Sequence, residues 1–502
     1  MTIGINITEL VSQGSPVLEG DNELTPGFLV VSKRGPADFP ILITSMNQFK
    51  RLFGEHTTAG YGAYVLEGYF LNGGRKAFVS RIVGSGAAAS AVTLVDRAST
   101  PLDTLTIEAG YKGRLDKGTW GDNLSVAITD NVDDTTLFDL EVLLSGVTKE
   151  VWRGVTPATA VTAINDSVSG SEYIKATNEN STSTAPDNNP AVGSSNLSAG
   201  VAGSAPAVTA YNGVQADFTG VYAFDALDIS HLANAESTDA THLDNLRDYC
   251  SARGTILGVA SIPVASTVSS AKTFGQALQI SNAYMALYGG WVLVSDPIGS
   301  GPNPLKWVSP VGHVLGVYAR TLRDRGVHKA PAGVTDGQLK GVFDIDMDVN
   351  NDTDLTDLAT NGVNTLKAVP GYGNCVLVSR TLSKDVRWRF VNVRNLFNYV
   401  KRALKNGLAF VQQEPNDGVL RAKVKNNTVL PFMRTLFQAG AFGSGKFEDL
   451  VSIICDESNN PPNEIELGNF HLDMTFFPSK PAESIFISVA QQQTGSSAAS
   501  ET

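Results

Sequence analysis

Short apolar runs alternate with stretches of helical periodicity over the first part of the chain. Residues 28–31 and 77–79 are apolar runs of strand length. Residues 46–53 and 64–70 carry apolar side chains at helical spacing. Because strands and helices alternate over so short a distance, we predict α/β packing for residues 25–83.

The pattern changes after this segment, where helical periodicity gives way to strand-like runs. Three such runs cover residues 105–107, 124–128 and 138–144. Residues 178–209 consist mostly of Ser, Thr, Asn, Ala, Gly and Pro, with few large apolar side chains. We therefore predict that residues 84–215 form an inserted, outward-facing, β-rich domain, with 178–209 as a long surface loop or a disordered segment.

Helical periodicity returns in the central part of the chain. Helices are predicted around residues 243–250, 274–287 and 311–323. The apolar runs at 256–259 and 291–294 are predicted to be strands. This alternation again predicts βαβ units.

The C-terminal third contains the most regular helical pattern. Its apolar face consists of Leu396, Phe397, Val400, Ala403 and Leu404. A second helix is predicted over residues 428–438, ending at Gly440.

These patterns divide the chain into six parts. In chain order they are an N-terminal arm (1–24), the first part of the core (25–83), an inserted outer domain (84–215), a central α/β domain (216–380), a C-terminal core domain (381–484) and a C-terminal arm (485–502).

Strand-like segments stand at both ends of the chain. Their large apolar side chains alternate with other residues and are Ile3, Ile5, Ile7, Ile485, Ile487 and Val489. The N-terminal segment runs into a tether rich in Gly, Ser and Asp, and no strand follows it closely enough to form a hairpin. An unpaired strand gains main-chain hydrogen bonds by adding to the exposed edge of another chain. We therefore expect both segments to act as arms between subunits.

Composition and charge narrow the range of partners. The chain has 502 residues, of which 42% are hydrophobic and 18% are charged, as in ordinary globular proteins. Its formal net charge is −12. Because duplex binding needs clustered Lys and Arg, this charge argues against nucleic acid as a partner.

Cysteine usage and the start of the chain indicate a reducing compartment. Cys250, Cys375 and Cys455 are widely separated and form no C-x-x-C pair. The first residues lack the basic region and apolar run of a signal peptide, and no apolar run has the length of a membrane span. We expect a protein that folds in a cytoplasm without direct membrane insertion.

One glycine-rich segment matches most of a phosphate-binding loop. Gly440 and Gly445-Lys446 have the required spacing, but Phe447 occupies the place of the Ser or Thr that would hold magnesium. The segment also follows a predicted helix, whereas a phosphate-binding loop follows a buried strand. The preferred interpretation is a helix-capping turn, and no nucleotide cofactor is expected.

Residues 346–354 resemble a calcium loop, with oxygen-bearing side chains at alternate positions. Asn351 stands at the sixth place, where Gly is required, and Asp357 stands at the twelfth, where a longer Glu normally reaches the ion. An acidic loop that leads into a helix is the preferred interpretation. Calcium binding stays open as the alternative.

No group of residues has the spacing of a catalytic or metal site. The six histidines include no H-E-x-x-H pair, and no serine lies in a G-x-S-x-G motif. His313 and His328 are interpreted as packed or hydrogen-bonded residues. We expect a protein that is not an enzyme and has no catalytic residue, cofactor or metal ligand.

Several groups of residues, taken together and in chain order, resemble contractile tail sheath proteins. The first groups lie at residues 25–27, 34–36 with Pro40, 53–54, 69–74 and 78–83. Residues 117–123 resemble the family's G-x-W-G-N element, with Asp122 in an additional or altered place. Residues 325–332 resemble the G-V-W-K-A-P-A segment, with His328 where Trp is usual. The remaining groups are residues 380–382, Trp388 with Val393 and Arg394, 414–416 and 478–483.

The resemblance implies a multidomain α/β fold, whose conserved core is built from both chain ends and carries the outer insertion. It implies a structural subunit that polymerises as stacked rings of six around an inner tube. Contraction by rigid-body repacking would then drive the tube through a cell envelope. The implied partners are further copies of the chain, the inner tail tube protein, and baseplate and tail terminator proteins. The implied location is a virion tail or a contractile injection particle, assembled in the host bacterial cytoplasm.

The predicted C-terminal helix carries positive charge in an acidic chain. Opposite its apolar face lie Arg394, Lys401, Arg402 and Lys405. Contact with an acidic inner tube and a solvated helix surface both stay open as interpretations.

Two other functions also stay open. The chain could be the sheath of a bacterial contractile injection system or bacteriocin instead of a phage sheath. In a different class, the acidic loop and the polar insertion suggest a calcium-binding surface-array protein, against which the lack of signal-peptide features argues.

Overall fold

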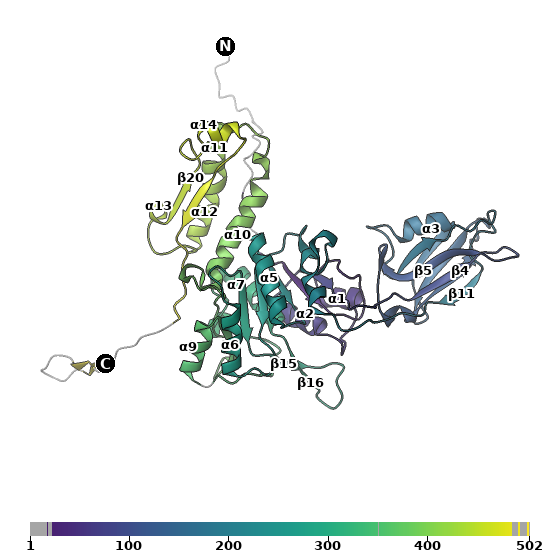
Figure 1. Ribbon diagram of the computed structural model, residues 1–502, viewed down its shortest axis with the longest axis horizontal. Helices are drawn as coiled ribbons and strands as arrows, with labels where there is room; N and C mark the ends of the chain where they lie inside the picture. Colours follow the sequence, from purple (N-terminus) through teal and green to yellow (C-terminus); the bar gives the residue numbers. More distant parts are fainter. Residues whose placement is uncertain (1–17, 19–22, 350, 484–489, 492–498, 501–502) are drawn as a thin grey trace, which may run out of the picture.

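The computed structural model describes residues 18, 23–349, 351–483, 490–491 and 499–500. Its largest element is an eight-stranded sheet with the order β19-β18-β14-β13-β12-β1-β3-β2 (Figure 1). The six strands from β18 to β3 are parallel, and the edge strands β19 and β2 are antiparallel to their neighbours. The bounds are β1 Pro26–Val30, β2 Ile41–Ile43, β3 Ala77–Arg81, β12 His231–Asn234, β13 Leu257–Ser261, β14 Met285–Gly289, β18 Val363–Val369 and β19 Gly373–Val376.

Helices cover both faces of this sheet, so each face has its own apolar core. One core takes side chains from α1 (Met46–Phe53), α2 (Gly62–Leu71) and α7 (Val311–Arg325). The other takes them from α5 (Ala240–Arg253), α6 (Val268–Leu278) and α9 (Asp352–Thr360). Strands buried on both faces read as continuous apolar runs, which is why β1 and β13 could be predicted from sequence.

Smaller elements complete this central unit. A three-stranded antiparallel sheet has the order β16-β15-β17, with bounds β15 Val292–Ser295, β16 Leu305–Val308 and β17 Asp344–Ile345. The short helices are α4 Val208–Asn212, η2 Gln215–Asp217, η3 Gly220–Phe224, α8 Gly333–Asp336 and η4 Val386–Trp388. We call this body, built from residues 23–83 and 208–390, the central unit.

The outer unit, residues 84–205, contains two four-stranded sheets that share one core (Figure 1). One sheet has the order β10-β5-β4, with β6 paired to β5, and the other has the order β11-β7-β8-β9. The bounds are β4 Ala91–Val95, β5 Asp103–Tyr111, β6 Arg114–Leu115, η1 Thr119–Asn123, β7 Leu124–Asp130, β8 Phe138–Leu144, β9 Val147–Val155, α3 Pro157–Ile164, β10 Ile174–Asn178 and β11 Gly193–Asn196. The unit ends earlier than residue 215, because Tyr211 already belongs to the core of the central unit.

Residues 178–209 are mostly irregular and exposed, as predicted for a surface loop, but they also contain a short strand. β11 pairs antiparallel with β7, and Leu197 is buried in the core of the outer unit. Ala88 and Val201 exchange two backbone hydrogen bonds. The polar composition did not reveal this strand, because the segment pairs through its backbone and buries few side chains.

The C-terminal unit, residues 391–478, extends from the central unit along the long helix α10 (Figure 1). Its core also includes Leu18, which packs against Gly407. The bounds are α10 Val391–Gly407, η5 Ala409–Val411, α11 Gly418–Ala422, the π-helix η6 Lys423–Val429, α12 Leu430–Gln438, α13 Phe447–Leu450, β20 Val451–Ile454, α14 Pro462–Glu466 and β21 Asp473–Phe476. Two further short strands, β22 Ala490–Gln491 and β23 Ala499–Ser500, pair with each other.

Two sequence predictions differ from this architecture. The large sheet takes its strands from residues 26–81 and 231–376, so the core sheet is not built from both chain ends. The C-terminal part builds a separate core instead. The helix predicted over 274–287 ends at Leu278, and β14 begins at Met285. The apolar residues Ile280, Ala283 and Tyr284 lie within this loop, so the sequence pattern did not reveal the break.

Among the described residues, no helix is both long and apolar enough to cross a bilayer.

Candidate functional sites at the junctions between the units

The first junction joins the outer unit to the central unit through buried charges. Arg81 is the last residue of β3, and Arg34 follows β1, so neighbouring parallel strands bring both guanidinium groups to one edge of the sheet. Asp116 of the outer unit accepts from both: Arg81 Nη1 lies 3.0 Å from Oδ1, and Arg34 Nε lies 3.4 Å from Oδ2. All three residues are at least 95% buried. We call these residues, together with Trp120, the outer junction.

Burial lowers the pKa of both arginines, and the carboxylate of Asp116 opposes this effect. The remaining guanidinium donors reach backbone oxygens: Arg81 Nη1 donates to Gly35 O at 2.7 Å, and Arg34 Nη2 donates to Glu172 O at 2.6 Å. Two cations therefore share one anion, and carbonyl groups solvate the excess positive charge.

Trp120 adds a stacking contact to the outer junction. The Arg34 guanidinium carbon lies 3.6 Å from the centroid of the Trp120 ring. Nearby, Asp122 Oδ1 accepts from Ser90 Oγ at 2.8 Å and from Gly200 N at 3.0 Å. Segments 34–36, 78–83 and 117–123, which carry part of the family resemblance, therefore meet at the outer junction. Sequence reasoning noted these segments but missed Asp116, because only the fold reveals its partners.

The second junction lies between α10 and the central unit, and it corrects the prediction for Arg394. Arg394 is fully buried, with its guanidinium carbon 3.9 Å from the Tyr284 ring centroid and 4.0 Å from that of Trp388. Its Nη2 donates to Asn282 Oδ1 at 2.5 Å, and burial lowers its pKa to about 10. Arg394 therefore does not lie on an exposed basic face. The helical pattern was right, but the central unit covers this side of the helix as well.

The other three basic residues of α10 point in different directions. Lys401 Nζ donates to Gly254 O at 3.1 Å and to the Tyr284 hydroxyl at 3.2 Å. Arg402 lines a cavity under the helix, and Lys405 is exposed. The structure thus brings Arg394 and Lys401 together at Tyr284, but it does not form a single basic face from all four residues.

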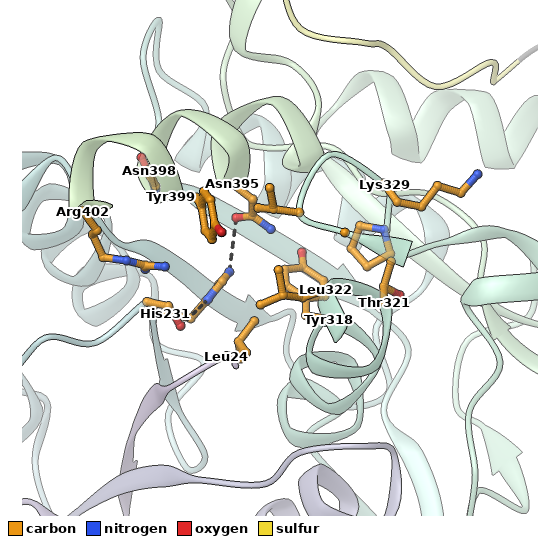
Figure 2. Close-up of a pocket in the computed structure, with 14 residues that line it drawn as sticks. Leu24, His231, Tyr318, Thr321, Leu322, Lys329, Asn395, Asn398, Tyr399 and Arg402 are labelled. Atoms are coloured by element: carbon orange, nitrogen blue, oxygen red, sulfur yellow. Dashed lines mark hydrogen bonds between the residues drawn. The ribbon is translucent and has the colours of Figure 1, made fainter. Parts of the chain in front are cut away.

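The cavity under α10 is drawn in Figure 2. It has a volume of about 30 Å³, which corresponds to about one water molecule. His231 points toward α10, where its Nε2 lies 3.2 Å from Asn395 Oδ1, and its Nδ1 lies 3.1 Å from Ser230 Oγ. Burial is the main reason that the pKa of His231 falls to about 3, and the nearby charge of Arg402 adds to the effect. His231 is thus a neutral hydrogen-bonding residue of the junction. The cavity is too small for a substrate.

The segment at residues 325–332 also reaches this junction. Asn392 Nδ2 donates to His328 O at 2.8 Å and to Ser479 O at 3.2 Å. Three groups that carry the family resemblance, around His328, Trp388 and Ser479, therefore meet at the start of α10.

The two motif-like segments have structural explanations. Gly440 lies in the turn after α12, and Lys446 is an exposed residue before the four-residue helix α13, so the segment lacks the strand-to-helix context of a phosphate-binding loop. In the acidic loop, both carboxylate oxygens of Asp346 accept backbone hydrogen bonds, from Trp291 N at 2.5 Å and from Ala265 N at 2.7 Å. Asn351 caps α9 by accepting from Asp354 N at 2.7 Å. In the described part of the chain, no group of three or more His, Cys, Asp or Glu residues has metal-binding geometry.

The predicted arm residues Ile3, Ile5, Ile7, Ile485, Ile487 and Val489 lie outside the described residues.

No sequence model of a protein family matches the chain. Individual proteins do match it. The chain is 25% identical over 227 residues to the tail sheath protein of Vibrio phage KVP40, a match that covers 44% of this chain and 32% of that protein. It is 24% identical over 217 residues to the tail sheath protein of Enterobacteria phage T4, covering 43% and 31%. The chain thus spans about a third of the length of these relatives.

Solved structures match over nearly the whole chain. The sheath complex of an extracellular contractile injection system, PVC, in its contracted state superposes with a TM-score of 0.59 and 18% identity, over 98% of each chain. A sheath tail protein from Listeria innocua superposes with a TM-score of 0.59 and 14% identity, over 92% of this chain and 96% of that one. The fold is therefore that of a sheath protein, including the outer and C-terminal units. The chain is thus similar in sequence to phage tail sheath proteins, and it has the fold of contractile tail sheath proteins from phage-type tails and from contractile injection systems.

Proposed function

We propose that this chain is the structural subunit of a contractile sheath. It polymerises with further copies as stacked rings of six around an inner tube, and contracts by rigid-body repacking to drive that tube through a cell envelope. The observation that carries the proposal is the match to a contracted sheath over 98% of the chain. Baseplate and tail terminator proteins are proposed as the partners at the two ends of the sheath, in a virion tail or an injection particle assembled in the host bacterial cytoplasm.

The outer junction and the second junction, between α10 and the central unit, support the proposal that the subunit moves as a rigid body. Each unit has its own core, and buried polar networks at specific residues join neighbouring units. A subunit that keeps its shape while the lattice repacks needs junctions of this kind, because interfaces between units with few apolar contacts otherwise allow relative motion. Rigid-body rotation at interfaces is a common mode of large conformational change.

Arms at the chain ends remain our proposal for how subunits stay connected. The described part of the chain offers an edge to which such arms could add. β20 and β21 form a sheet of only two strands, each of four residues. So small a sheet is weak on its own and is stabilised by additional strands. We propose these edges as the acceptor for arm residues of neighbouring copies.

Contact with the inner tube is proposed for the exposed end of α10. Arg394 is excluded because it is buried, and Lys401 is held by Tyr284. Lys405 is exposed, and no ion pair of its side chain appears in the described residues. Of the four basic residues of α10, we therefore propose Lys405 as the main contact with the inner tube. Lys401 and Arg402 would have a minor role in this contact.

Electron microscopy of the purified full-length chain tests the function directly. We expect hollow, striated tubes with six subunits per ring. Particles that stay monomeric at high protein concentration, with and without an inner tube protein, would contradict the proposal. The alternative of a calcium-binding surface array predicts flat sheets that form only with calcium, and the backbone contacts of Asp346 give it no support.

A further inference from the structure

A positively charged hollow lies on the central unit, beside the C-terminal ends of α6 and α9. It has a volume of about 270 Å³. Its lining contains three cationic side chains, and is formed by Gln279, Ala359, Thr360, Arg380, Thr381, Ser383, Lys384 and Arg389. No acidic residue is among these lining residues.

The backbone around the hollow is held in place by hydrogen bonds. Thr381 N donates to Arg389 O at 2.7 Å, so the two sides of the 380–390 loop are joined. Asn364 Nδ2 donates to Arg380 O at 2.7 Å, and Ser383 Oγ donates to Ser281 O at 2.7 Å. The hydroxyl-bearing residues Thr381 and Ser383 are at least 94% buried. The three cations are therefore attached to a fixed frame.

Two of these cations lack a counterion. In the described part of the chain, neither Lys384 nor Arg389 makes an ion pair or a side-chain hydrogen bond. The nearest acidic neighbour in sequence, Asp385, is bound to Arg387, with Arg387 Nη2 2.8 Å from Oδ2. The C-terminal ends of α6 and α9 supply partial negative charge worth about half an elementary charge each. The helix ends offset about one positive charge and Glu483 pairs with Arg380, so of the three positive charges the hollow keeps an excess of about one.

Arg380 shows which chemistry the hollow suits. Arg380 also lines a second, adjoining hollow, where it binds the carboxylate of Glu483 with Nε 2.9 Å from Oε1 and Nη2 2.5 Å from Oε2. Forked pairs of this kind favour carboxylates over other groups. Nη1 of Arg380 takes no part in this pair, and no acidic residue is among the residues that line the first hollow.

We propose that this hollow is a carboxylate-binding site, and that its occupant is an acidic side chain from a second copy of this chain. The proposal rests on the proposed function, since it requires copies of the chain to pack together. The chain has a formal net charge of −12, so its copies present many acidic side chains and repel one another at long range. A local cationic hollow on each copy would turn part of that repulsion into specific attraction and fix the register between neighbours.

The test uses the full-length chain and the double variant Lys384→Glu/Arg389→Glu. The matched control is Lys149→Glu/Lys446→Glu, which makes the same change of charge at two exposed lysines far from the hollow. Sedimentation gives the critical concentration for assembly, and circular dichroism confirms the fold. We expect at least a tenfold rise in critical concentration for the hollow variant, and less than a twofold change for the control. Assembly of the hollow variant at the wild-type concentration would overturn the proposal and leave the proposed function standing.

A second experiment uses citrate as a polycarboxylate probe on the monomer at low protein concentration. We expect citrate to raise the Tm of the wild type by several degrees and to leave the hollow variant unchanged, which supports a carboxylate site. Equal shifts in both proteins would overturn it. If the wild type forms no polymer under any condition, the proposed function fails and so does the assignment of a second copy as occupant. The citrate experiment then still decides whether the hollow binds carboxylates. A parallel experiment with inorganic phosphate shows whether the hollow binds any small anion or carboxylates in particular.

Discussion

Asp116 of the outer unit lies between Arg34 and Arg81 of the central unit, and its two carboxylate oxygens accept from one arginine each. In the sequence, Arg34 lies 82 positions before Asp116, and Arg81 lies 35 positions before it. One carboxylate thus holds the ends of two parallel strands and the base of the outer unit together. Because all three side chains are buried, the contact is energetically sensitive to the loss of any member.

Replacing Asp116 by Asn should destabilise the protein strongly. The change leaves two buried guanidinium groups without an anion, which costs about 3–5 kcal/mol in comparable cases. Urea unfolding measures the loss. The matched control is Asp130→Asn, which breaks the exposed pair with Arg97 and should cost less than about 1 kcal/mol. Equal losses for the two variants would show that the outer junction is not a special contact.

The helices of the central unit show what a sequence can predict. The predicted helix at 46–53 has the observed bounds, because Ser45 caps its start through Gln48 N and Gly54 ends it with a φ of 88°. Both signals are local in sequence. Strands that are buried on both faces can also be predicted from sequence, because they are continuous apolar runs.

The junctions between units could not be predicted in this way. A helical pattern places Arg394 opposite the apolar face of α10, but it does not reveal that Tyr284 and Trp388 cover that side too. Asp116 has no local signal at all, since its partners come from strands brought together by the parallel sheet. In both places the missing information is long-range contact between polar groups, which periodicity does not encode.

Leu197 tests whether residues 178–209 belong to the core of the outer unit. The side chain is 1% exposed, so Leu197→Ala should cost about 2–5 kcal/mol. The control is Val192→Ala, since the side chain of Val192 is 57% exposed and its loss should change stability by less than about 0.5 kcal/mol. Differential scanning calorimetry measures both. A negligible effect of Leu197→Ala would show that the whole segment is a dispensable loop.

His242 should make stability fall as the pH drops. Its ring lies between Asn212 Oδ1, 2.8 Å from Nδ1, and Asn234 Nδ2, 3.0 Å from Nε2. Asn234 Oδ1 accepts from Glu236 N at 2.8 Å, which orients the amide so that its NH2 group faces the ring. Nε2 must therefore accept a hydrogen bond, and only the neutral ring fits.

Burial lowers the pKa of His242 from its ordinary value of 6.5 to about 4. Between these two values the unfolded chain binds a proton that the folded chain does not, so the free energy of unfolding falls as the pH falls. From pH 6.5 to pH 5 this contribution amounts to about 2 kcal/mol. Urea unfolding at pH 7 and pH 5 should therefore show a smaller drop for His242→Gln than for the wild type. An identical drop in both proteins would mean that His242 is protonated in the folded state.

Lys446→Ala should change neither stability nor assembly. The side chain is exposed and precedes a four-residue helix, so we expect a change within about 0.5 kcal/mol. Phe447 occupies the position where magnesium would need a hydroxyl, so no ATP hydrolysis should be detectable with either protein. Phosphate release with and without magnesium measures this. Assembly that depends on nucleotide would contradict the structural interpretation of the segment.

Removal of residues 2–15 should separate folding from assembly. From the sequence we expect residues 2–15 to add little to a core within the same chain, because they run into a tether rich in Gly, Ser and Asp. Leu18, just beyond them, packs against Gly407 of α10. The truncated chain should therefore unfold cooperatively at close to the wild-type temperature. If Ile3, Ile5 and Ile7 pair with a neighbouring copy, each would contribute about 1.5–3 kcal/mol when fully buried, and this contribution repeats at every subunit of the lattice. We expect calorimetry to show a normal transition and electron microscopy to show no tubes.

The control is the triple variant Ile3→Val/Ile5→Val/Ile7→Val, which keeps the strand pattern and should still assemble at a higher protein concentration. Tubes of normal length from the truncated chain would eliminate strand exchange by this arm, even though the fold and the similarity to sheath proteins would stand.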